Sequence, residues 1–400
     1  MRLWVLAGAL MASALAGCVQ PSGTLNPQAS GEAAKSAMTL VPVSFSALPG
    51  WAEDHPAQAL APFLAGCAQM GEAPLGGSSD AASLGGTASA WQAACASGKS
   101  VRAGDDAAAR RFFEAQFQPY AVQSDGKAEG LFTGYYEPEV RGSRSPGAGY
   151  NVALLTKPND LVQVDLGAFS DDLRGKRISG RIQGNAFVPY YDRAAIEAGA
   201  LRGRRLELLW LADPVDAFFL QIQGSGRVRL PDNKIARVTY AGQNGRPYVP
   251  IGRVLADRGQ IPLDQVSMQS IRAWLDSHPT EAASVMDQNP SYVFFREVIG
   301  VRPDEGPPGA MGAPLAPGRS IAVDRSYIPL GTPVFIDTTD PVDGSKLQRL
   351  TVAQDIGGAI KGPVRADIFF GWGTDAETHA GKMRQQGHDY LLLPKAAPVG

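Results

Sequence analysis

The sequence has 400 residues, which is long enough for two domains that each contain a sizeable hydrophobic core. Hydrophobic residues make up 44% of the chain and charged residues 19%, a composition typical of globular proteins. The formal net charge is −2 and no basic run of the kind that a phosphate backbone requires is present, so nucleic acid is excluded as an expected partner.

Residues 1–17 have the layout of an export signal. One early cation, Arg2, precedes an apolar stretch that is too short for a membrane-spanning helix. The stretch ends in small residues directly before Cys18 and resembles the lipobox of bacterial lipoproteins. This resemblance implies cleavage before Cys18 and attachment of lipid to it. The alternative is an ordinary signal peptide followed by a coincidental cysteine.

Residues 18–40 are rich in proline, serine, glycine and alanine, which predicts a flexible tether. Acyl chains contribute about 0.8 kcal/mol for each buried methylene, so more than one chain on Cys18 would anchor the protein stably. Val19 follows the cysteine, where an aspartate is associated with retention in the inner membrane. We therefore expect a lipid anchor in the outer membrane, with the protein facing the periplasm.

Export would place Cys67 and Cys95 in an oxidising compartment. A disulfide between them would stabilise the fold by about 3 to 4 kcal/mol in the chain-entropy treatment. Two buried free thiols are the alternative, because spacing in the sequence does not fix the geometry that a disulfide needs.

Residues 41–130 are predicted to form a mainly helical part. A short alternating stretch, residues 41–51, is typical of a strand. Apolar residues at helical spacing follow in three segments: 55–70, 87–98 and 104–120. Glycine and serine in residues 76–86 indicate a loop between the first two helices.

The pattern changes to short strands from Phe132 onward. Strand-like runs separated by Gly, Pro, Asn and Asp lie at residues 150–155, 161–166, 180–184, 185–191, 205–211, 226–230 and 235–242. Such close spacing predicts a β-barrel or β-sandwich instead of alternating strand–helix–strand units. Residues 264–286 return to a helical pattern.

Strands resume after Pro290. They are expected at residues 292–298, 318–324, 332–338, 347–355 and 365–371. One last helix is expected to start at Thr374, where Thr374 and Glu377 match a capping box, and to stop at Gly387.

Several common chemistries are absent from the sequence. The stretch around Ser225 has two glycines but lacks the third glycine of a dinucleotide fingerprint, and it does not match the Gly-x-Ser-x-Gly nucleophile motif. No pair of histidines has the spacing of a zinc site, and packing roles are expected for all four: His55, His278, His379 and His388. We expect no metal ion and no cofactor.

Three aspartates stand out by their context: Asp324, Asp355 and Asp367. Each begins or ends an apolar run, which predicts positions at strand ends. Aspartates at such places are also common as turn formers and helix caps. The chemistry of the residues alone gives no preference among the three.

A set of motifs in a fixed order resembles the membrane-bound lytic murein transglycosylase A family. The resemblance spans about residues 130–394. Its first part consists of FTGYYEPEV, PYYDRAAIEAG, FFLQIQGSGRVRL, GQNGRPY and NPSYVFF. Its second part, which is similar to the family's terminal domain named for three aspartates, includes GRSIAVDRSYIPLGTPVFIDT, AQDIGGAIKGPVRADIFFGWG and AGKMRQQGHDYLLLP.

The resemblance implies a mainly β fold with flanking helices. A double-psi β-barrel domain would carry an inserted second β-rich domain, with a groove between the two. The expected parts are an N-terminal helical part that packs on the barrel (41–130), an inserted glycan-binding domain (131–288) and a catalytic barrel domain (289–396).

The resemblance also implies an activity. The family cleaves the β-1,4 bond between N-acetylmuramic acid and N-acetylglucosamine of peptidoglycan and leaves a 1,6-anhydro ring. The family's catalytic aspartate matches Asp367, and Asp355 and Asp324 match the other two aspartates, expected in or near the groove. A monomer is expected, with cell-wall synthesis or division proteins as further partners.

One carboxylic acid is sufficient for such a reaction, because the nucleophile is the C6 hydroxyl of the same sugar. We hypothesise that Asp367 first protonates the glycosidic oxygen and then accepts the C6 proton. Its pKa must then be raised, either by burial against Ile368, Phe369 and Phe370 or by the like charge of Asp355.

Aromatic side chains are expected to stack on the sugars, with polar side chains beside them. The aromatic candidates are Tyr135, Tyr136, Tyr190 and Tyr248, and the hydrogen-bonding candidates are Gln223, Ser225 and Asn244. Packing in the core is the alternative for each tyrosine. Lys361 either binds the substrate or is a solvated loop cation.

Two other functions compete with this interpretation. An inverting glycan hydrolase would need a second carboxylate about 6.5 to 9.5 Å from Asp367, for which Glu137, Glu139 and Asp355 are available. A non-catalytic peptidoglycan-binding lipoprotein would keep the aromatic residues and would not need Asp367.

Overall fold

The structure is a computed structural model that describes residues 36–70, 88–174, 176–300, 302 and 305–395. The predicted signal (1–17), the lipidation site Cys18, the tether up to residue 35 and the loop at 76–86 lie outside the described residues.

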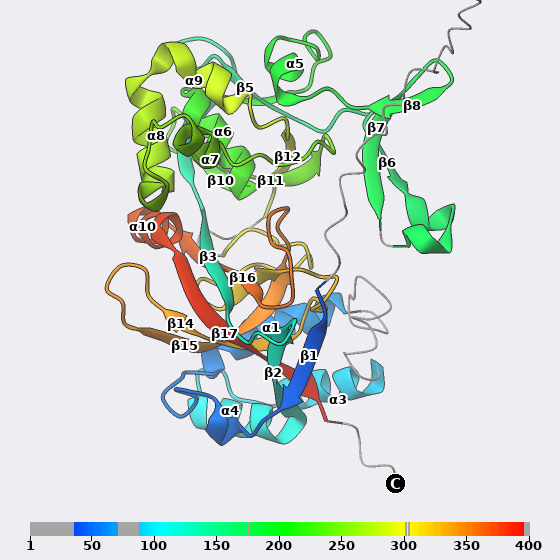
Figure 1. Cartoon of the computed structure of the whole chain (residues 1–400), viewed down its shortest axis with the longest axis vertical. Coiled ribbons are helices and arrows are strands. Elements are labelled where there is room, and N and C mark those ends of the chain that lie inside the picture. The colour runs from blue at the N-terminus through cyan, green and yellow to red at the C-terminus, as the bar shows by residue number, and fades with distance from the viewer. Residues whose placement is uncertain (1–35, 71–87, 175, 301, 303–304, 396–400) are drawn as a thin grey trace, which may run out of the picture. The chain divides into compact units, whose positions relative to one another are not determined.

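The described residues form three β-sheets with helices packed around them (Figure 1). The strands are β1 Met38–Pro42, β2 Phe117–Ser124, β3 Gly130–Glu137, β4 Glu139–Ser143, β5 Val152–Leu155, β6 Val162–Asp165, β7 Arg177–Gln183, β8 Ala186–Pro189, β9 Glu207–Leu211, β10 Ser225–Arg229, β11 Ile235–Gln243, β12 Val293–Val298, β13 Ser320–Val323, β14 Pro333–Thr339, β15 Lys346–Asp355, β16 Arg365–Trp372 and β17 Arg384–Pro394. The helices are α1 Ala57–Gln69, α3 Ala88–Gly98, α4 Asp106–Gln116, α5 Arg193–Glu197, α6 Pro214–Gln223, α7 Ile251–Asp257, α8 Met268–Ser277, α9 Pro279–Met286 and α10 Thr374–Lys382.

Six strands of the largest sheet close into a ring. The pairing runs β17, β14, β15, β13, β16 and β3, and β3 then pairs with β17 again. The long strand β17 allows this closure, because residues 384–387 pair with β3 and residues 388–391 pair with β14. Apolar side chains from all six strands form one core cluster, which includes Phe132, Ile321, Ile336, Ala353, Ile368 and Leu391.

Helices α1, α3 and α4 cover one side of this sheet. Phe63 of α1 and Phe113 of α4 form a second buried cluster with Phe335, Val352 and Leu392 from strands β14, β15 and β17. The rings of Phe63 and Phe113 meet edge to face with their centroids 6.0 Å apart. The N-terminal helical part is therefore packed against strands of the closed ring.

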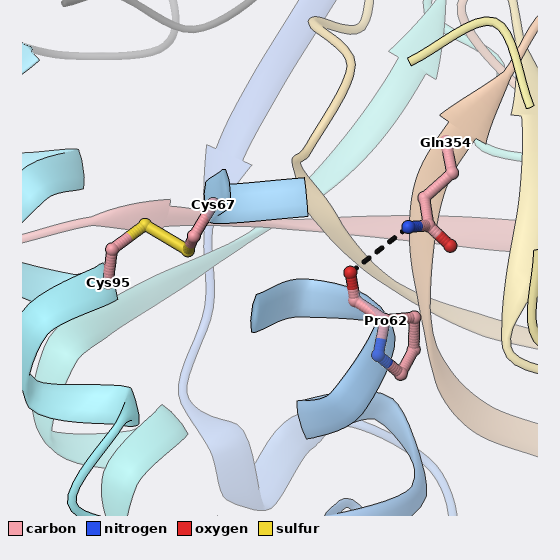
Figure 2. Close-up of a disulfide and its surroundings, with 4 residues drawn as sticks. All are labelled: Pro62, Cys67, Cys95 and Gln354. Carbon is pink, nitrogen blue, oxygen red and sulfur yellow. Dashed lines mark hydrogen bonds between the residues drawn. A yellow bond between two sulfur atoms is a disulfide. The ribbon is translucent and has the colours of Figure 1, made fainter. Parts of the chain in front are cut away.

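A disulfide joins α1 to α3 (Figure 2). It links Cys67 to Cys95, with 5.8 Å between their Cα atoms. On the same helix α1, the carbonyl of Pro62 accepts a hydrogen bond from Nε2 of the buried Gln354 at 3.0 Å. Gln354 directly precedes Asp355, so α1 holds the end of β15 that carries this aspartate.

Replacing both cysteines with serine is expected to lower the free energy of unfolding. The disulfide closes a loop with a sequence separation of 28 residues, which corresponds to about 3 to 4 kcal/mol in the chain-entropy treatment. Urea unfolding of the double variant and of the parent measures the difference. A change below about 1 kcal/mol would show that the helices α1 and α3 are held without the crosslink.

The inserted part contains a sheet of six strands in the order β12, β11, β10, β4, β9 and β5, and a separate sheet of β6, β7 and β8. Helices α6, α7, α8 and α9 pack together through buried apolar residues that include Phe218, Leu255, Leu275 and Val285. No helix within the described ranges has the length and apolar character needed to cross a membrane.

Most predicted strands are present, but the end of the chain differs from the prediction. Gly387 does not stop a helix. It lies within β17 opposite Gly130, and a Cβ atom there would be 2.6 Å from the carbonyl oxygen of Asp337. The predicted capping box is also wrong, because Gly373 is the N-cap of α10 and no side chain caps this helix.

Helix α6 is not among the predicted helices, although the sequence contains the signals for its boundaries. Asp213 caps its N-terminus by accepting from the backbone N–H of Val215 at 2.8 Å, and Pro214 occupies the first turn. Gly224 ends the helix with φ of +78°, a conformation that favours glycine.

Candidate active site

Asp367 lies on β16 of the closed ring, beside Thr133 of β3. The two strands run parallel, and Asp367 is the register partner of Thr133. The Thr133 hydroxyl donates a hydrogen bond to Oδ1 of Asp367 at 2.6 Å. Asp367 is half-buried as a residue, and its carboxyl group is held by the protein.

The direction of this hydrogen bond is set by Arg365. Nη2 of Arg365 donates to the Thr133 hydroxyl oxygen at 2.9 Å. Because a guanidinium has no acceptor, the Thr133 hydroxyl can only accept from Arg365, and its own proton points to Asp367. Oδ1 of Asp367 is therefore an acceptor, and a proton on this carboxyl group belongs on Oδ2.

The pKa of Asp367 is raised above its usual value. Burial is the largest cause, while the hydrogen bond from Thr133 and the positive charge of Arg365 act in the opposite direction. A carboxyl group with a raised pKa suits a general acid that must start in the protonated state.

Asp355 lies at the end of β15 and accepts more hydrogen bonds than Asp367. Its Oδ1 accepts from the backbone N–H groups of Ala310 and Ile356, both at 2.9 Å. Its Oδ2 accepts from the hydroxyl of Tyr135, also at 2.9 Å. The pKa of Asp355 is also raised above its usual value. Burial is the largest cause and the nearby charge of Asp367 adds to it, while these three donors act in the opposite direction.

Strand β3 positions both aspartates. Thr133 and Tyr135 are two residues apart, so their side chains leave the same face of the strand. Thr133 contacts Asp367, and Tyr135 contacts Asp355. The pair of carboxyl groups is therefore assembled by a strand that lies more than 200 residues earlier in the chain.

Asp324, the third predicted aspartate, holds a loop. It is buried, and its Oδ1 accepts from the backbone N–H and hydroxyl of Ser326 at 3.0 and 2.7 Å. Its Oδ2 accepts from the backbone N–H of Gly362 at 3.0 Å. Gly362 has φ of +105°, which favours glycine. Asp324 thus fixes the segment between Asp355 and Asp367, on which Lys361 is exposed.

Four of the predicted sugar contacts are buried in the structure, which favours packing roles for them over direct contact with a sugar. They are Tyr136, Tyr190, Ser225 and Asn244. The Tyr190 hydroxyl donates to Asp160 at 2.9 Å. The Asn244 amide donates to the carbonyls of Tyr191 and Pro290 at 2.9 and 2.8 Å. The hydroxyl of Tyr190 and the amide of Asn244 thus form hydrogen bonds within the protein. For Tyr190 this agrees with the alternative of packing in the core.

Besides Lys361, the predicted contacts Tyr248 and Gln223 keep exposed surface. Tyr248 is 41% exposed. Gln223 is half-buried at the end of α6, and its Oε1 accepts from the backbone N–H of Tyr136 at 3.2 Å. Gln223 therefore ties the inserted part to β3 while part of its side chain reaches the surface.

The carboxylates that a hydrolase would need as a second group are already bound. Glu137 is fully buried and is hydrogen-bonded to Arg227 and Arg237. Glu139 accepts from Nε of Arg229 at 2.8 Å. Within the described parts of the chain, no group of three or more His, Cys, Asp or Glu side chains is arranged to hold a metal ion.

Thr133 and Arg365 were not among the predicted site residues. Their spacing was an available signal, because Arg365 lies two residues before Asp367 and Thr133 lies two residues before Tyr135. Alternation along a strand places such residues on one face. The pairing of β3 with β16, which brings the two faces together, is not visible in the sequence.

Replacing Thr133 with valine is expected to change the pH dependence of activity. Its hydrogen bond lowers the pKa of Asp367, so its loss raises this pKa and keeps the acid protonated to higher pH. The alkaline limb of the profile of kcat/KM against pH should move upward. Thr378→Val, which removes a hydroxyl bonded within α10, is the control. An unmoved or lowered limb would contradict this role of Thr133.

Comparisons with known proteins define the class of this chain. Residues 131–296 match the MltA specific insert domain, and residues 319–393 match the 3D domain. The chain is 33% identical over 308 residues to membrane-bound lytic murein transglycosylase A of Escherichia coli K12, which covers 74% of each chain. The chain belongs to the membrane-bound lytic murein transglycosylase A family, as the sequence motifs indicated.

Solved structures agree with this assignment. A membrane-bound lytic murein transglycosylase from Agrobacterium tumefaciens superposes with a TM-score of 0.77 at 36% identity, covering 89% of this chain and 98% of the other. Escherichia coli MltA with bound chitohexaose has a TM-score of 0.62 at 27% identity, covering 90% and 92%. The predicted mainly β fold with some helices is confirmed.

Proposed function

We propose that this chain is a lytic transglycosylase that cleaves the β-1,4 bond between N-acetylmuramic acid and N-acetylglucosamine in peptidoglycan. Its relatives bear the name of this activity, and a solved relative holds chitohexaose, a chain of linked amino sugars. The main observation in support of the proposal is the environment of Asp367. Its Oδ1 accepts a hydrogen bond from Thr133, and its pKa is raised, as a general acid requires.

In the first step, Oδ2 of Asp367 donates its proton to the glycosidic oxygen, and the bond from this oxygen to C1 of the muramic acid breaks. In the second step, the C6 oxygen of the same sugar bonds to C1, and its proton passes to Asp367. The acid is restored, and no water enters the product. The intramolecular attack draws on a high effective molarity, which makes a carboxylate that positions water dispensable.

The two aspartates have different environments that fit different charge states. Within the described ranges, three hydrogen bonds reach Asp355 and one reaches Asp367. Donors favour the ionised form of a carboxyl group, whereas burial favours the neutral form. Burial raises the pKa of both carboxyl groups, but its three donors make Asp355 the more readily ionised of the two. Asp355 is therefore assigned as the neighbour that stabilises positive charge developing at C1, and Asp367 as the acid.

The sugar chain is proposed to lie in a groove between a double-psi β-barrel and the inserted domain. The closed ring of six strands supports the barrel assignment. We propose a helical part that begins at residue 41, an inserted part that runs from β4 to β12, and a barrel part that contains β3 and the strands from β13 onward. These boundaries replace 131–288 and 289–396, because β3 pairs within the ring and β12 pairs with β11. Gln223, Tyr248 and Lys361 are the proposed substrate contacts, because their side chains are wholly or partly exposed.

The proposed setting is the outer membrane, with the chain facing the periplasm. The names of the relatives include the term membrane-bound, which supports membrane association. Cys18 would carry the lipid, and the protein would act as a monomer together with proteins of cell-wall synthesis or division.

The inverting hydrolase is disfavoured by the state of its candidate second carboxylates. Glu137 is paired with two arginines, Glu139 with Arg229, and Asp355 with three donors. An inverting hydrolase needs a carboxylate that accepts a proton from water beside the sugar. The existing partners of Glu137, Glu139 and Asp355 compete with this role.

Digestion of purified peptidoglycan by a form that lacks residues 1–18 tests the proposal. Mass spectrometry should show products that are lighter by one water than the hydrolysis products. Free reducing ends would support the hydrolase, and binding without any products would support the non-catalytic protein. Either result would contradict the proposed function.

A further inference from the structure

A buried ion cluster lies where the chain leaves the closed ring. Glu137 is the last residue of β3, and its carboxylate has no exposed surface. Nε of Arg227 donates to Oε2 of Glu137 at 2.9 Å. Arg237 donates to both oxygens of Glu137, from Nε at 2.9 Å and from Nη2 at 2.8 Å. Arg227 lies on β10 and Arg237 on β11, so two strands of the inserted sheet bind the end of a ring strand.

The same cluster contacts the place where the chain returns to the ring. Nη1 of Arg237 donates to the carbonyls of Arg302 and Glu305 at 3.3 and 3.0 Å. These residues lie between β12 of the inserted sheet and β13 of the ring. One guanidinium therefore ties the outgoing and the returning segments together.

The cluster also reaches the strand that carries Asp367. The guanidinium of Arg227 lies 4.1 Å from the ring centroid of Trp372, the last residue of β16. Glu137 and Trp372 are register partners in the pairing of β3 with β16, as are Thr133 and Asp367. The same two strands thus carry the acid with its donor and, further along, Glu137 and Trp372, which form the junction cluster together with Arg227 and Arg237.

Buried charges are costly unless they are paired with good geometry, and apolar residues of similar volume often hold a junction as strongly. The two arginines give the junction a defined orientation instead, because a planar guanidinium binds a carboxylate through directional hydrogen bonds. The neighbouring contacts add to this alignment. The backbone N–H of Arg227 donates to the carbonyl of Pro138 at 2.8 Å, and Gln223 accepts from Tyr136.

We propose that Arg227 and Arg237 are positioning residues that align the inserted sheet with Asp367, so that a long glycan strand bound along the inserted part presents its bond to the acid. This inference rests on the proposed function. It assigns the cluster no contact with the sugar and no part in proton transfer. Loss of the cluster should therefore lower the activity on long substrates, which contact both the inserted part and the ring. It should have less effect on short substrates, which bind only near Asp367.

The test compares Glu137→Gln and Arg227→Lys with the parent enzyme on long glycan strands and on a tetrasaccharide. Glu137→Gln removes the central charge, and Arg227→Lys keeps the charge but removes the planar fork. For long strands, kcat/KM of Glu137→Gln should fall by about 100-fold, the loss expected from misplacement of the substrate by about 1 Å. For the tetrasaccharide the loss should be much smaller. Arg227→Lys should show the same dependence on substrate length with a smaller loss of kcat/KM. If Glu137→Gln does not fold, Arg227→Lys alone tests the inference.

The exposed pair Arg229 and Glu139 provides the matched control. Arg229 lies on β10, two residues after Arg227, and Glu139 lies on β4, two residues after Glu137, but the pair is at the surface. Glu139→Gln should leave both substrates unaffected. Equal losses on long and short substrates, or no loss on either, would overturn the inference. Absence of anhydro products from the parent enzyme would instead reject the proposed function.

Discussion

Replacing Asp367 with asparagine is expected to lower kcat by about 1,000-fold or more, because one group is assigned both proton transfers and general acid–base catalysis contributes about 100- to 10,000-fold. The amide cannot protonate the leaving oxygen. Its carbonyl can still accept the hydrogen bond from Thr133 that the carboxyl accepts at Oδ1, so the fold should be preserved. Turnover of purified peptidoglycan and the thermal midpoint together separate loss of chemistry from loss of structure.

The control for this variant is Asp375→Asn, which changes an exposed aspartate in the first turn of α10. It should keep the activity of the parent. Activity of Asp367→Asn near the parent value would remove Asp367 from the chemistry and with it the mechanism.

The second large effect is expected at Asp54, which joins the N-terminal segment to the closed ring. Oδ1 of Asp54 accepts from Arg319 at 2.9 Å, and Oδ2 accepts from the backbone N–H of Leu350 at 2.7 Å. Arg319 also donates to Gln58 and to the Leu350 carbonyl. Asp54 and Arg319 are both buried. Asp54→Ala would leave the Arg319 charge buried without its carboxylate, which costs about 3 to 5 kcal/mol of unfolding free energy.

Urea unfolding of Asp54→Ala measures this cost. Asp257→Ala removes the exposed partner of Arg253 on α7 and should cost about 0 to 1 kcal/mol. A cost for Asp54→Ala within the range of this surface control would show that the N-terminal segment is held by apolar packing alone.

The strands of the fold were largely predictable because each is a short apolar run bounded by turn residues. Residues 205–211 and 235–242, for example, correspond to β9 and β11. Local sequence failed where long-range packing decides the conformation. Gly387 was interpreted as a helix stop, yet its small size serves the close approach of β17 to β14 and β3, which are distant in the sequence.

In the site, too, local motifs were predictable and contacts between distant parts of the chain were not. The motifs identified the three aspartates, and the structure brings Asp355 and Asp367 to one strand, β3. The sequence could not separate polar residues that face a ligand from those that serve the fold. Asn244 was interpreted as a sugar contact, but its side chain is consumed by backbone groups of residues 191, 246, 290 and 292.

The assignment of Thr133 and Arg365 as partners of Asp367 also depends on contacts across a large distance in the chain. Their hydrogen bonds connect residues separated by 232 and 234 positions. Only the register of β3 against β16 reveals that the acid has one bound oxygen and one oxygen available for a proton.

The central claim is that the cleaved sugar closes on its own C6 hydroxyl and that water takes no part. Digestion of purified peptidoglycan in water enriched with oxygen-18 tests it most directly. The account predicts that the newly formed muramic acid ends carry no oxygen-18 and are lighter than hydrolysed ends by one water. One oxygen-18 atom at each new end would show that water attacks C1, and the account would be wrong.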